Sequence, residues 1–409
     1  MNDFARELIF TEQEIDYLLS PEAIRIQAKA IFDMCQDRKS YFVYHPENFL
    51  PAVAYVLQVI KKNYPDLNIP FHSRWGHFRV GGIDRVLELN KKLSGETEME
   101  IARSKIDLVI TSVLLDAGAG MKWKFLEKNE TYSRSEGLGV ASFHLFMSGA
   151  MSEDKTSPRV DANGLLSLRT QDLEEAFQVS AKNPLVGVEG RLKLLHNLAL
   201  ALENKKFFKD SRPGNLVDYL VETHGKEIPA KGILRAVLDA LGSIWPGRLS
   251  ASGVNLGDVW KHSTVSSVGG LKSLVPLHKL SQWMTYSLIE PIMEAGLTVV
   301  GVEELTGLAE YRNGGLMLDS GLLSFKNPED ALKDWLPGDD LVIEWRALTV
   351  YLLDQMAVEI RKTLNKSPKD FPLAKVLEGG TWWAGRYLAQ EKREGATSPI
   401  NLVSDGTVF

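Results

Sequence analysis

The pattern of hydrophobic and polar positions along the chain predicts a mainly helical protein. Apolar residues recur through most of the sequence at the spacing of one helix face. Helix-start signals precede several of these runs, such as Ser20-Pro21 and the capping pattern of Thr97 and Glu100. Residues 41–44 have strand composition, so we expect at most a small minor β-sheet. The expected helices cover about 21–37, 46–62, 97–113, 134–146, 170–179, 188–203, 215–224, 340–363 and 373–390.

The stretch from Gly247 to Arg312 departs from this pattern, because polar and ionisable residues interrupt its apolar positions. Asp258 lies among apolar neighbours, His278 begins a polar group beside Trp283, and residues 310–312 read Glu-Tyr-Arg. Burying an unpaired charge costs free energy, so such groups persist inside a protein when they are paired or used for chemistry. We therefore predict that this stretch forms a wall of an active site.

The length and composition are those of a globular protein with a large core. The chain has 409 residues, of which 44% are hydrophobic and 24% charged. We find no internal repeat and no convincing linker, and residues 150–168 are predicted to be a polar surface excursion. The expectation is one large helical domain, with two lobes and a cleft between about 1–205 and 206–409 as the alternative.

The charge and the cysteine count restrict the function and the location. A net charge of -6 argues against a surface that binds nucleic acid or anionic membrane. The single Cys35 excludes an intrachain disulfide framework and fits a reducing compartment. The N-terminus lacks a signal-peptide pattern, and no apolar run is long enough for a membrane span. We expect a cytoplasmic protein that acts on a small molecule; its oligomeric state is not predicted.

The motifs of common cofactor and metal sites are absent from the sequence. There is no GxxxxGK[ST], no GxGxxG after a strand and no HExxH, so we expect no cofactor. His72 and His77 are five residues apart, which does not place them on one helical face. No metal site is predicted, although one built from dispersed histidines is an alternative.

The turn at residues 207–214 combines aromatic, basic and glycine residues and precedes a helix that Asn215 is expected to cap. Backbone N–H groups at a helix start, together with Lys209 and Arg212, favour a negative charge. We therefore consider an anion site here. The alternative is a capped turn whose charges are solvated.

Seven segments of the chain have distinctive sequences: FHSRWGHF (71–78), DLVITSVLLDAGAGMKW (107–123), SRSEGLGVAS (133–142), PGRLSASGVNLGDVW (246–260), VPLHKLSQWMTYSLIEP (275–291), ELTGLAEYRNGGL (304–316) and DGTVF (405–409). Together they resemble the uracil-catabolism protein family, which is best known in fungi and also occurs in bacteria. The resemblance covers the chain from about residue 20 to Phe409. It implies a role in the reductase-independent breakdown of uracil, where the family acts on a ribosylurea-type intermediate to give urea and a ribose moiety. The implied reaction is hydrolysis of an N-glycosidic bond.

The order of segments is also similar to that of the queuosine 5′-phosphate N-glycosylases, which are helical and related in fold to DNA glycosylases. Their Phe-x-Lys element corresponds here to Phe207-Phe208-Lys209, ahead of the helix at 216–222. Their Ala-Asp-x-Trp element, which carries the catalytic aspartate, corresponds to residues 257–260, and their Asp-Tyr-Arg element to residues 310–312. In this chain Gly257 stands in place of the Ala of the first of these elements, and Glu310 in place of the Asp of the second. The base-recognition residues of that family have no counterpart that we assign.

The resemblance implies a catalytic carboxylate at Asp258. Hydrolysis of an N-ribosyl bond passes through an oxocarbenium-like cation, so a carboxylate is needed near C1′. Asp258 would stabilise this cation and orient or deprotonate the water. The alternative from the local sequence is an aspartate that caps a helix or has a purely structural partner.

Urea is a poor anion, so its departure requires an acid or hydrogen-bond donors. We expect these among Glu136, His72 and Arg74, whose planar guanidinium matches a carbonyl, while Trp75 can stack on a planar urea. The alternative for the segment 71–78 is a buried turn with satisfied histidines.

If the sugar carries a 5′-phosphate, Lys209 and Arg312 are the expected contacts. The neighbouring polar residues Glu310, Tyr311 and His278 complete the predicted substrate-binding set. For Lys209 and Arg312 the alternative is a pair of solvated surface charges.

Two competing functions belong to other classes. The first is a metal-dependent amidohydrolase that cleaves a ureido C–N bond with His72, His77 and distant carboxylates. The second is a helical nucleotide-binding or scaffold protein of the same pathway. Ionisable groups within apolar segments disfavour the second, because a scaffold gains nothing from burying them.

Overall fold

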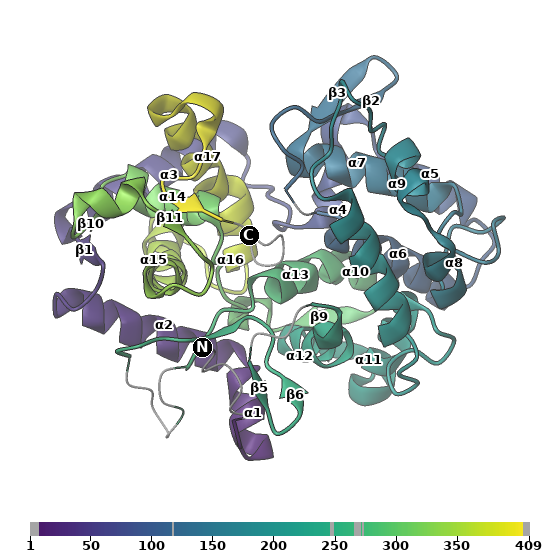
Figure 1. The fold of residues 1–409 in the computed structure, drawn as a ribbon, viewed down its shortest axis with the longest axis horizontal. Helices are drawn as coiled ribbons and strands as arrows, with labels where there is room; N and C mark the ends of the chain where they lie inside the picture. Colours follow the sequence, from purple (N-terminus) through teal and green to yellow (C-terminus); the bar gives the residue numbers. More distant parts are fainter. Residues whose placement is uncertain (1–7, 117, 246–248, 266–270, 272–273, 404–409) are drawn as a thin grey trace. The chain divides into compact units, whose positions relative to one another are not determined.

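A computed structural model of the chain describes residues 8–116, 118–245, 249–265, 271 and 274–403, and these residues are mainly helical (Figure 1). The predicted fold class is confirmed, and the predicted minor β-structure takes the form of several two-stranded sheets. Within these ranges, no helix combines the length and the apolar character that crossing a membrane requires. The closing segment DGTVF and residues 246–248 lie outside the described residues.

The chain divides into two compact units that interleave in sequence. Unit 1 comprises Met1–His72, Gly247–Gln282 and Gly301–Phe409, and unit 2 comprises Ser73–Pro246 and Trp283–Val300. Helix α13 (Lys279–Glu294) begins in unit 1 and continues in unit 2. A single cut in the sequence therefore cannot separate the units. One domain, or two lobes divided near residue 205, stays a prediction.

Helices make up most of unit 1, together with short strand pairs. The antiparallel pairs are β1–β10, β5–β6 and β7–β8, and β11 pairs with β12 in parallel. The elements are α1 (Glu12–Leu18), α2 (Pro21–Gln36), β1 (Phe42–Tyr44), η1 (Pro46–Asn48), α3 (Phe49–Asn63), β5 (Ser250–Ala251), β6 (Val254–Asn255), β7 (Val259–Lys261), β8 (Leu274–Pro276), η6 (Val302–Glu304), α14 (Tyr311–Asp319), β10 (Leu323–Phe325), η7 (Pro328–Leu332), β11 (Asp334–Trp335), α15 (Asp340–Leu364), α16 (Leu373–Val376), the π-helical η8 (Leu377–Thr381), α17 (Trp382–Lys392), η9 (Glu394–Ala396) and β12 (Asn401–Leu402).

Unit 2 has the same character. Its strands pair as the antiparallel hairpin β2–β3 and the parallel pair β4–β9. The elements are α4 (Arg74–His77), η2 (Val80–Gly82), α5 (Arg85–Lys92), α6 (Glu98–Leu114), β2 (Lys124–Glu127), β3 (Glu130–Ser133), α7 (Arg134–Met147), α8 (Ala162–Ser167), α9 (Thr170–Ala176), α10 (Val188–Ala201), η3 (Pro213–Asn215), α11 (Leu216–His224), β4 (Glu227–Pro229), α12 (Ala230–Leu241), η4 (Gly242–Ile244) and β9 (Thr298–Val300).

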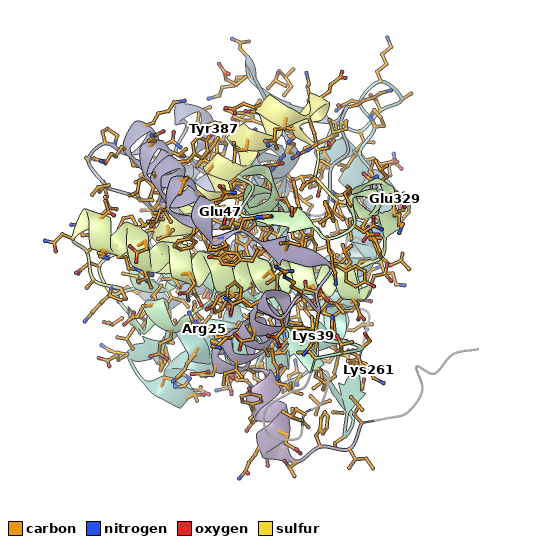
Figure 2. The ribbon with its side chains drawn as sticks, turned by 90° about the vertical axis from the view of Figure 1, so that its left-hand side faces the viewer. Arg25, Lys39, Glu47, Lys261, Glu329 and Tyr387 are labelled. Atoms are coloured by element: carbon orange, nitrogen blue, oxygen red, sulfur yellow. The ribbon has the colours of Figure 1, made fainter. Side chains whose placement is uncertain are left out.

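Helix α15 is the main core element of unit 1. It is buried along most of its length and packs against α2, α3 and α14. In Figure 2 this long helix runs across the view, and Arg25 on α2 lies beside it. The Arg25 guanidinium donates to Asp354 of α15 at 2.9 Å and to the Leu305 carbonyl at 2.8 Å. Arg25 therefore ties α2 both to α15 and to the segment that leads into α14.

Most expected helices are found within a few residues of their predicted ends, but two predicted caps differ. Ser20 caps α2 as expected, with its hydroxyl accepting from the Ala23 N–H at 3.1 Å. The Thr97 hydroxyl accepts from the Glu100 N–H at 3.2 Å. The Glu100 carboxylate pairs with Arg103 and Arg212, so it does not complete the predicted capping box. Asn215 has helical backbone angles, and its side chain makes no capping bond.

The predicted surface excursion at 150–168 is partly wrong. Its residues Met151, Val160 and Leu165 are fully buried, and Asp161 caps α8 by accepting from the Gly164 N–H at 2.8 Å. The Val160 N–H donates to the buried Asp107 of α6 at 3.2 Å. A polar, turn-rich segment can enter a core when a partner of this kind satisfies its backbone groups.

Candidate active site

Asp258 lies at the start of strand β7 and is held by four hydrogen bonds from within unit 1. Its Oδ1 accepts from the Trp260 indole N–H at 2.6 Å and from Arg346 at 2.8 Å. Its Oδ2 accepts from the Lys279 backbone N–H at 3.0 Å and from Arg346 at 2.7 Å. The carboxylate therefore joins β7, the first residue of α13 and the middle of α15.

These contacts keep Asp258 ionised although it is enclosed. Burial raises the pKa of the Asp258 carboxyl, but the charge and the two hydrogen bonds of Arg346 outweigh it, so the pKa lies below its ordinary value of 3.8. Each of the two carboxylate oxygens accepts two hydrogen bonds. At neutral pH the group is a weak base with a fixed negative charge, which suits electrostatic stabilisation of a cation.

His278 lies next to Asp258 and is fully buried. Its Nε2 donates to the Leu18 carbonyl at 2.8 Å, and its backbone N–H reaches the Asp258 carbonyl at 3.4 Å. Burial lowers the pKa of the imidazole, so it is neutral at physiological pH. Its φ of 44° is unusual for a residue other than glycine, and this strain turns the chain into α13.

The segment from Glu310 to Arg312 forms the start of helix α14. Glu310 is the N-cap, and its carboxylate accepts from the N–H groups of Arg312 at 2.7 Å and Asn313 at 2.6 Å. Arg312 donates to the Ala396 carbonyl at 2.7 Å, and its guanidinium lies 4.7 Å from the centre of the Tyr311 ring. A carboxylate at this position is stabilised by the helix start.

Arg346 connects these groups. Besides holding Asp258, its Nε donates to the Ala309 carbonyl, directly before Glu310, at 3.3 Å. The structure thus gathers Asp258, His278 and the start of α14 around one buried guanidinium in unit 1. Sequence reasoning missed Arg346, because the only local signal was a charge within the apolar helix at 340–364.

His72 belongs to unit 1 and is paired with a different carboxylate. Its Nδ1 lies 2.8 Å from the Glu378 Oε2, and Glu378 also accepts from the Tyr64 hydroxyl at 3.2 Å. Burial and the adjacent Glu378 raise the pKa of Tyr64. Glu378 lies in the π-helical segment η8, a local geometry that is frequent at functional sites. The role of His72 as an acid stays a prediction.

Arg74 and Trp75 belong to unit 2 and are buried there. Arg74 pairs with Asp116 at 2.7 Å and donates to the Ser135 carbonyl at 2.7 Å. The Trp75 indole N–H donates to Glu294 at 3.0 Å. Glu136, half-buried in the first turn of α7, is also in unit 2. These contacts suffice for a structural role, and the predicted part of each residue in binding urea is untested.

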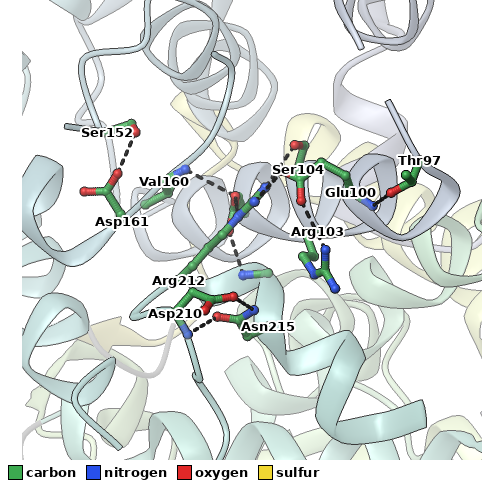
Figure 3. A network of polar contacts seen from close by, with 12 residues as sticks. Thr97, Glu100, Arg103, Ser104, Ser152, Val160, Asp161, Asp210, Arg212 and Asn215 are labelled. Carbon is green, nitrogen blue, oxygen red and sulfur yellow. Dashed lines mark hydrogen bonds and ion pairs between the residues drawn. The ribbon is translucent and has the colours of Figure 1, made fainter. Parts of the chain in front are cut away.

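The turn at 207–214 binds an anion from its own chain (Figure 3). The fully buried Asp107 carboxylate accepts from Arg212 at 2.7 Å and from the Gly214 N–H at 2.6 Å. Arg212 also pairs with Glu100. Lys209 is exposed and pairs with Glu222, so its predicted contact with a phosphate remains a prediction. The groups that the sequence suggested for an external anion are thus largely occupied by Asp107.

Two surface hollows occur among the described residues, and Glu100, the partner of Arg212, is part of the lining of the first. One, of about 670 Å³, is in unit 2 and includes Lys92, Arg103 and Arg159 in its lining. The other, of about 450 Å³, is in unit 1 between Tyr55 and Tyr387. Neither hollow is lined by a predicted site residue, so the case for a site rests on the buried cluster around Asp258.

The histidines proposed for a metal have other contacts. His72 is paired with Glu378, and His77 Nδ1 lies 2.9 Å from Arg74. In the part of the chain that the structure describes, no group of three or more histidine, cysteine or acidic side chains has the placement of a metal site.

Comparison with known proteins gives one family over nearly the whole chain. A family model described as "Protein of unknown function (DUF1688)" matches residues 17–409. Uracil catabolism protein 4 of Lachancea kluyveri is 37% identical, over 97% of this chain and 99% of its own. Protein urg3 of Schizosaccharomyces pombe is 38% identical, over 96% of this chain and 98% of its own.

Proposed function

We propose that this chain, which belongs to the family of Uracil catabolism protein 4 and Protein urg3, acts in uracil catabolism as a hydrolase of an N-ribosyl bond. The substrate would be ribosylurea or its 5′-phosphate, and the products urea and ribose or ribose 5-phosphate. The name of the Lachancea relative supplies the pathway. The observation that carries the reaction is the enclosed Asp258 carboxylate, which Arg346 keeps ionised.

The proposed reaction breaks the bond between C1′ and the ureido nitrogen. The bonding electrons leave with nitrogen, C1′ becomes cationic, and water adds to it; one proton of the water ends on urea. A negative charge beside C1′ lowers the energy of this cation. Because four donors hold Asp258 and its pKa is lowered, the group favours electrostatic stabilisation over removal of a proton from water.

The first test is urea release from synthetic N-ribosylurea and its 5′-phosphate, with and without chelator. We expect release that survives the chelator and is lost in Asp258→Asn. The matched control is Asp319→Asn, because Asp319 is also buried in unit 1 and paired at both oxygens with an arginine, Arg393, at 2.6 Å. This control should lose stability and retain turnover.

Other outcomes of this assay identify the competing functions. Release of ammonia in place of urea, or activity that the chelator removes, would indicate the metal-dependent amidohydrolase. Binding without turnover in the wild-type protein would indicate a nucleotide-binding or scaffold role. Full turnover in Asp258→Asn would remove Asp258 from the mechanism.

The proton donor to urea is proposed among His72 and Glu136. His72 has a carboxylate partner in Glu378, an arrangement that orients an imidazole for proton transfer. A pH–rate profile of His72→Ala and Glu136→Gln tests this, since the variant of the true donor loses one limb of the profile. A profile unchanged in both variants would exclude both residues as the acid.

A 5′-phosphate on the sugar would be contacted by Lys209 and Arg312. We expect Lys209→Ala to raise KM for the phosphorylated substrate far more than for the free riboside, because only the former carries the charge that lysine binds. Glu222→Gln is the matched control, since it frees Lys209 from its surface partner. Equal changes on both substrates in Lys209→Ala would refute the assignment.

A further inference from the structure

Two side-chain amides of unit 1, those of Gln282 and Asn313, are fully buried. Among the residues that the structure describes, neither the oxygen nor the nitrogen of either amide has a hydrogen-bond partner. The Nδ1 of the buried His278 is in the same condition within those ranges. Buried polar groups are nearly always paired, so an unpaired one requires an explanation, and a ligand that pairs with it is one.

The Asp258–Arg346 pair connects the two chain segments that carry these amides. Asp258 binds the N–H of Lys279, the first residue of α13, and Gln282 lies one turn further along this helix. Arg346 binds the carbonyl of Ala309, and Asn313 lies in the first turn of α14 just beyond it. Gln282 is therefore three residues, and Asn313 four residues, from a backbone group that this ion pair binds.

The direction of helical side chains favours the same convergence. In an α-helix the bond from Cα to Cβ tilts toward the N-terminus. The N-terminal ends of α13 and α14 both contact the Asp258–Arg346 pair. Along its own helix axis, Gln282 thus leans toward the N-terminal end of α13 and Asn313 toward that of α14. His278 lies one turn before Gln282, whose N–H donates to the His278 carbonyl at 2.9 Å.

The chemistry of these groups selects a neutral ligand. Both helix starts already bind a carboxylate of the chain, Asp258 at α13 and Glu310 at α14, so these backbone N–H groups are occupied and the remaining groups are neutral. Each amide offers one acceptor and two donors, and the Nδ1 of the neutral His278 offers an acceptor. A planar group with one carbonyl and several N–H groups matches this set.

We propose that Gln282, Asn313 and His278 bind a ureido group, –NH–CO–NH₂, beside Asp258. The inference rests on the proposed function, in which this group is the leaving urea. The amide N–H groups would donate to the ureido carbonyl, and the acceptors, including His278 Nδ1, would receive its N–H groups. As the C1′–N bond breaks, negative charge develops on the ureido group, and donors at its carbonyl stabilise that charge before a proton arrives.

The first experiment measures the stability of the ligand-free protein. Replacing an unpaired buried amide with leucine removes a polar group that burial penalises; leucine nearly matches asparagine in shape and is one heavy atom smaller than glutamine. Gln282→Leu and Asn313→Leu should therefore keep or raise Tm. The matched control is Asn215→Leu in unit 2, since the buried Asn215 amide is paired with Asp210 and Asp218. This control should lower Tm, and a similar loss in the two test variants would overturn the proposal.

The second experiment measures binding of N-ribosylurea by calorimetry in the Asp258→Asn background, where turnover is blocked. We expect at least a tenfold loss of affinity on adding Gln282→Leu or Asn313→Leu, and no change on adding Asn215→Leu. The same leucine variants with Asp258 intact should lose at least tenfold in kcat/KM for urea release. If Asp258→Asn fails to fold, the change in kcat/KM of these variants tests the ureido site by itself.

The outcomes separate this inference from the function on which it rests. Urea release by the wild type with unchanged binding and kcat/KM in both leucine variants would overturn the ureido site alone. Binding of N-ribosylurea that both leucine substitutions remove, without any urea release by the wild type, would overturn the hydrolase and retain the site.

Discussion

At the scale of single residues, the fully buried Asp107 and the partly buried Asp258 show how differently an arginine partner can act. Asp258 is held by Arg346 at both oxygens, and its pKa is lowered. Asp107 is bound by Arg212 through one oxygen and by two backbone N–H groups, yet burial raises its pKa to about 6. The same residue type is thus a fixed charge in one place and a titrating group in the other.

Asp107 leads to a prediction about pH and stability. Its folded pKa of about 6 exceeds its ordinary value of 3.8, so the protonated group favours folding. This contribution is fully present below about pH 4 and is lost as pH rises through about 6. By linkage it amounts to at most about 3 kcal/mol, since each pKa unit corresponds to about 1.36 kcal/mol.

The measurement is guanidinium unfolding of the wild type and Asp107→Asn at pH 4.5 and pH 7.5. Asp107→Asn cannot titrate at this position, whereas the wild type loses the contribution of protonated Asp107 as the pH rises. The free energy of unfolding of the variant minus that of the wild type should therefore increase from pH 4.5 to pH 7.5. A difference that is constant across this range would show that Asp107 does not titrate there.

At the scale of elements, close packing of α17 on α14 supports the candidate site. A Cβ placed on Gly385 would lie 2.0 Å from the backbone oxygen of Arg312, at the start of α14. Backbone atoms of a packed helix cannot move aside cheaply. The glycine on α17 therefore sets how near the two helices approach beside Glu310 and Arg312.

We expect Gly385→Ala to destabilise the protein by about 1–3 kcal/mol or more and to lower turnover by displacing the start of α14. The matched control is Gly190→Ala in α10, where an added Cβ meets nothing within 4 Å. This control should be neutral or stabilising by about 0.4–1 kcal/mol, because alanine narrows the unfolded ensemble. Thermal unfolding and urea release measure both effects, and equal stability of the two variants would contradict the packing argument.

At the scale of the whole molecule, the interleaved units determine which fragments can fold. Residues 73–246 are continuous and form most of unit 2, but they lack the part of α13 and the strand β9 that complete it. Strand β4 pairs with β9, and the buried Lys105 pairs with Glu294 of α13 at 2.7 Å. A fragment without these segments leaves a strand edge open and a buried lysine without its partner.

We therefore expect the fragment 73–246 to lack a cooperative thermal transition by circular dichroism, whereas the full chain shows one. Glu294→Ala in the full chain is the milder comparison, since it removes the partner of Lys105 and keeps the strand pair. It should lower Tm without abolishing the transition. A fragment that unfolds cooperatively would show that the later segments are dispensable for unit 2.

Many of the helices and some of their starts followed from the sequence by itself, because they depend on residues within a few positions of one another. The cap of α2 by Ser20 and the apolar face of the helix after Thr97 are of this kind. The family also followed from the sequence, since several long segments matched in residue identity and not only in pattern. The segment from 247 to 312 was correctly singled out as rich in buried polar groups.

Only the tertiary structure decided which of those polar groups meet. Asp258 and Arg346 are 88 residues apart in sequence, and Asp107 and Arg212 are 105 apart, distances at which periodicity and capping rules carry no information. The unpaired condition of Gln282 and Asn313 is likewise a property of their surroundings within the described fold. Local physics thus determines the elements, whereas the partner of a buried charge depends on how distant segments pack.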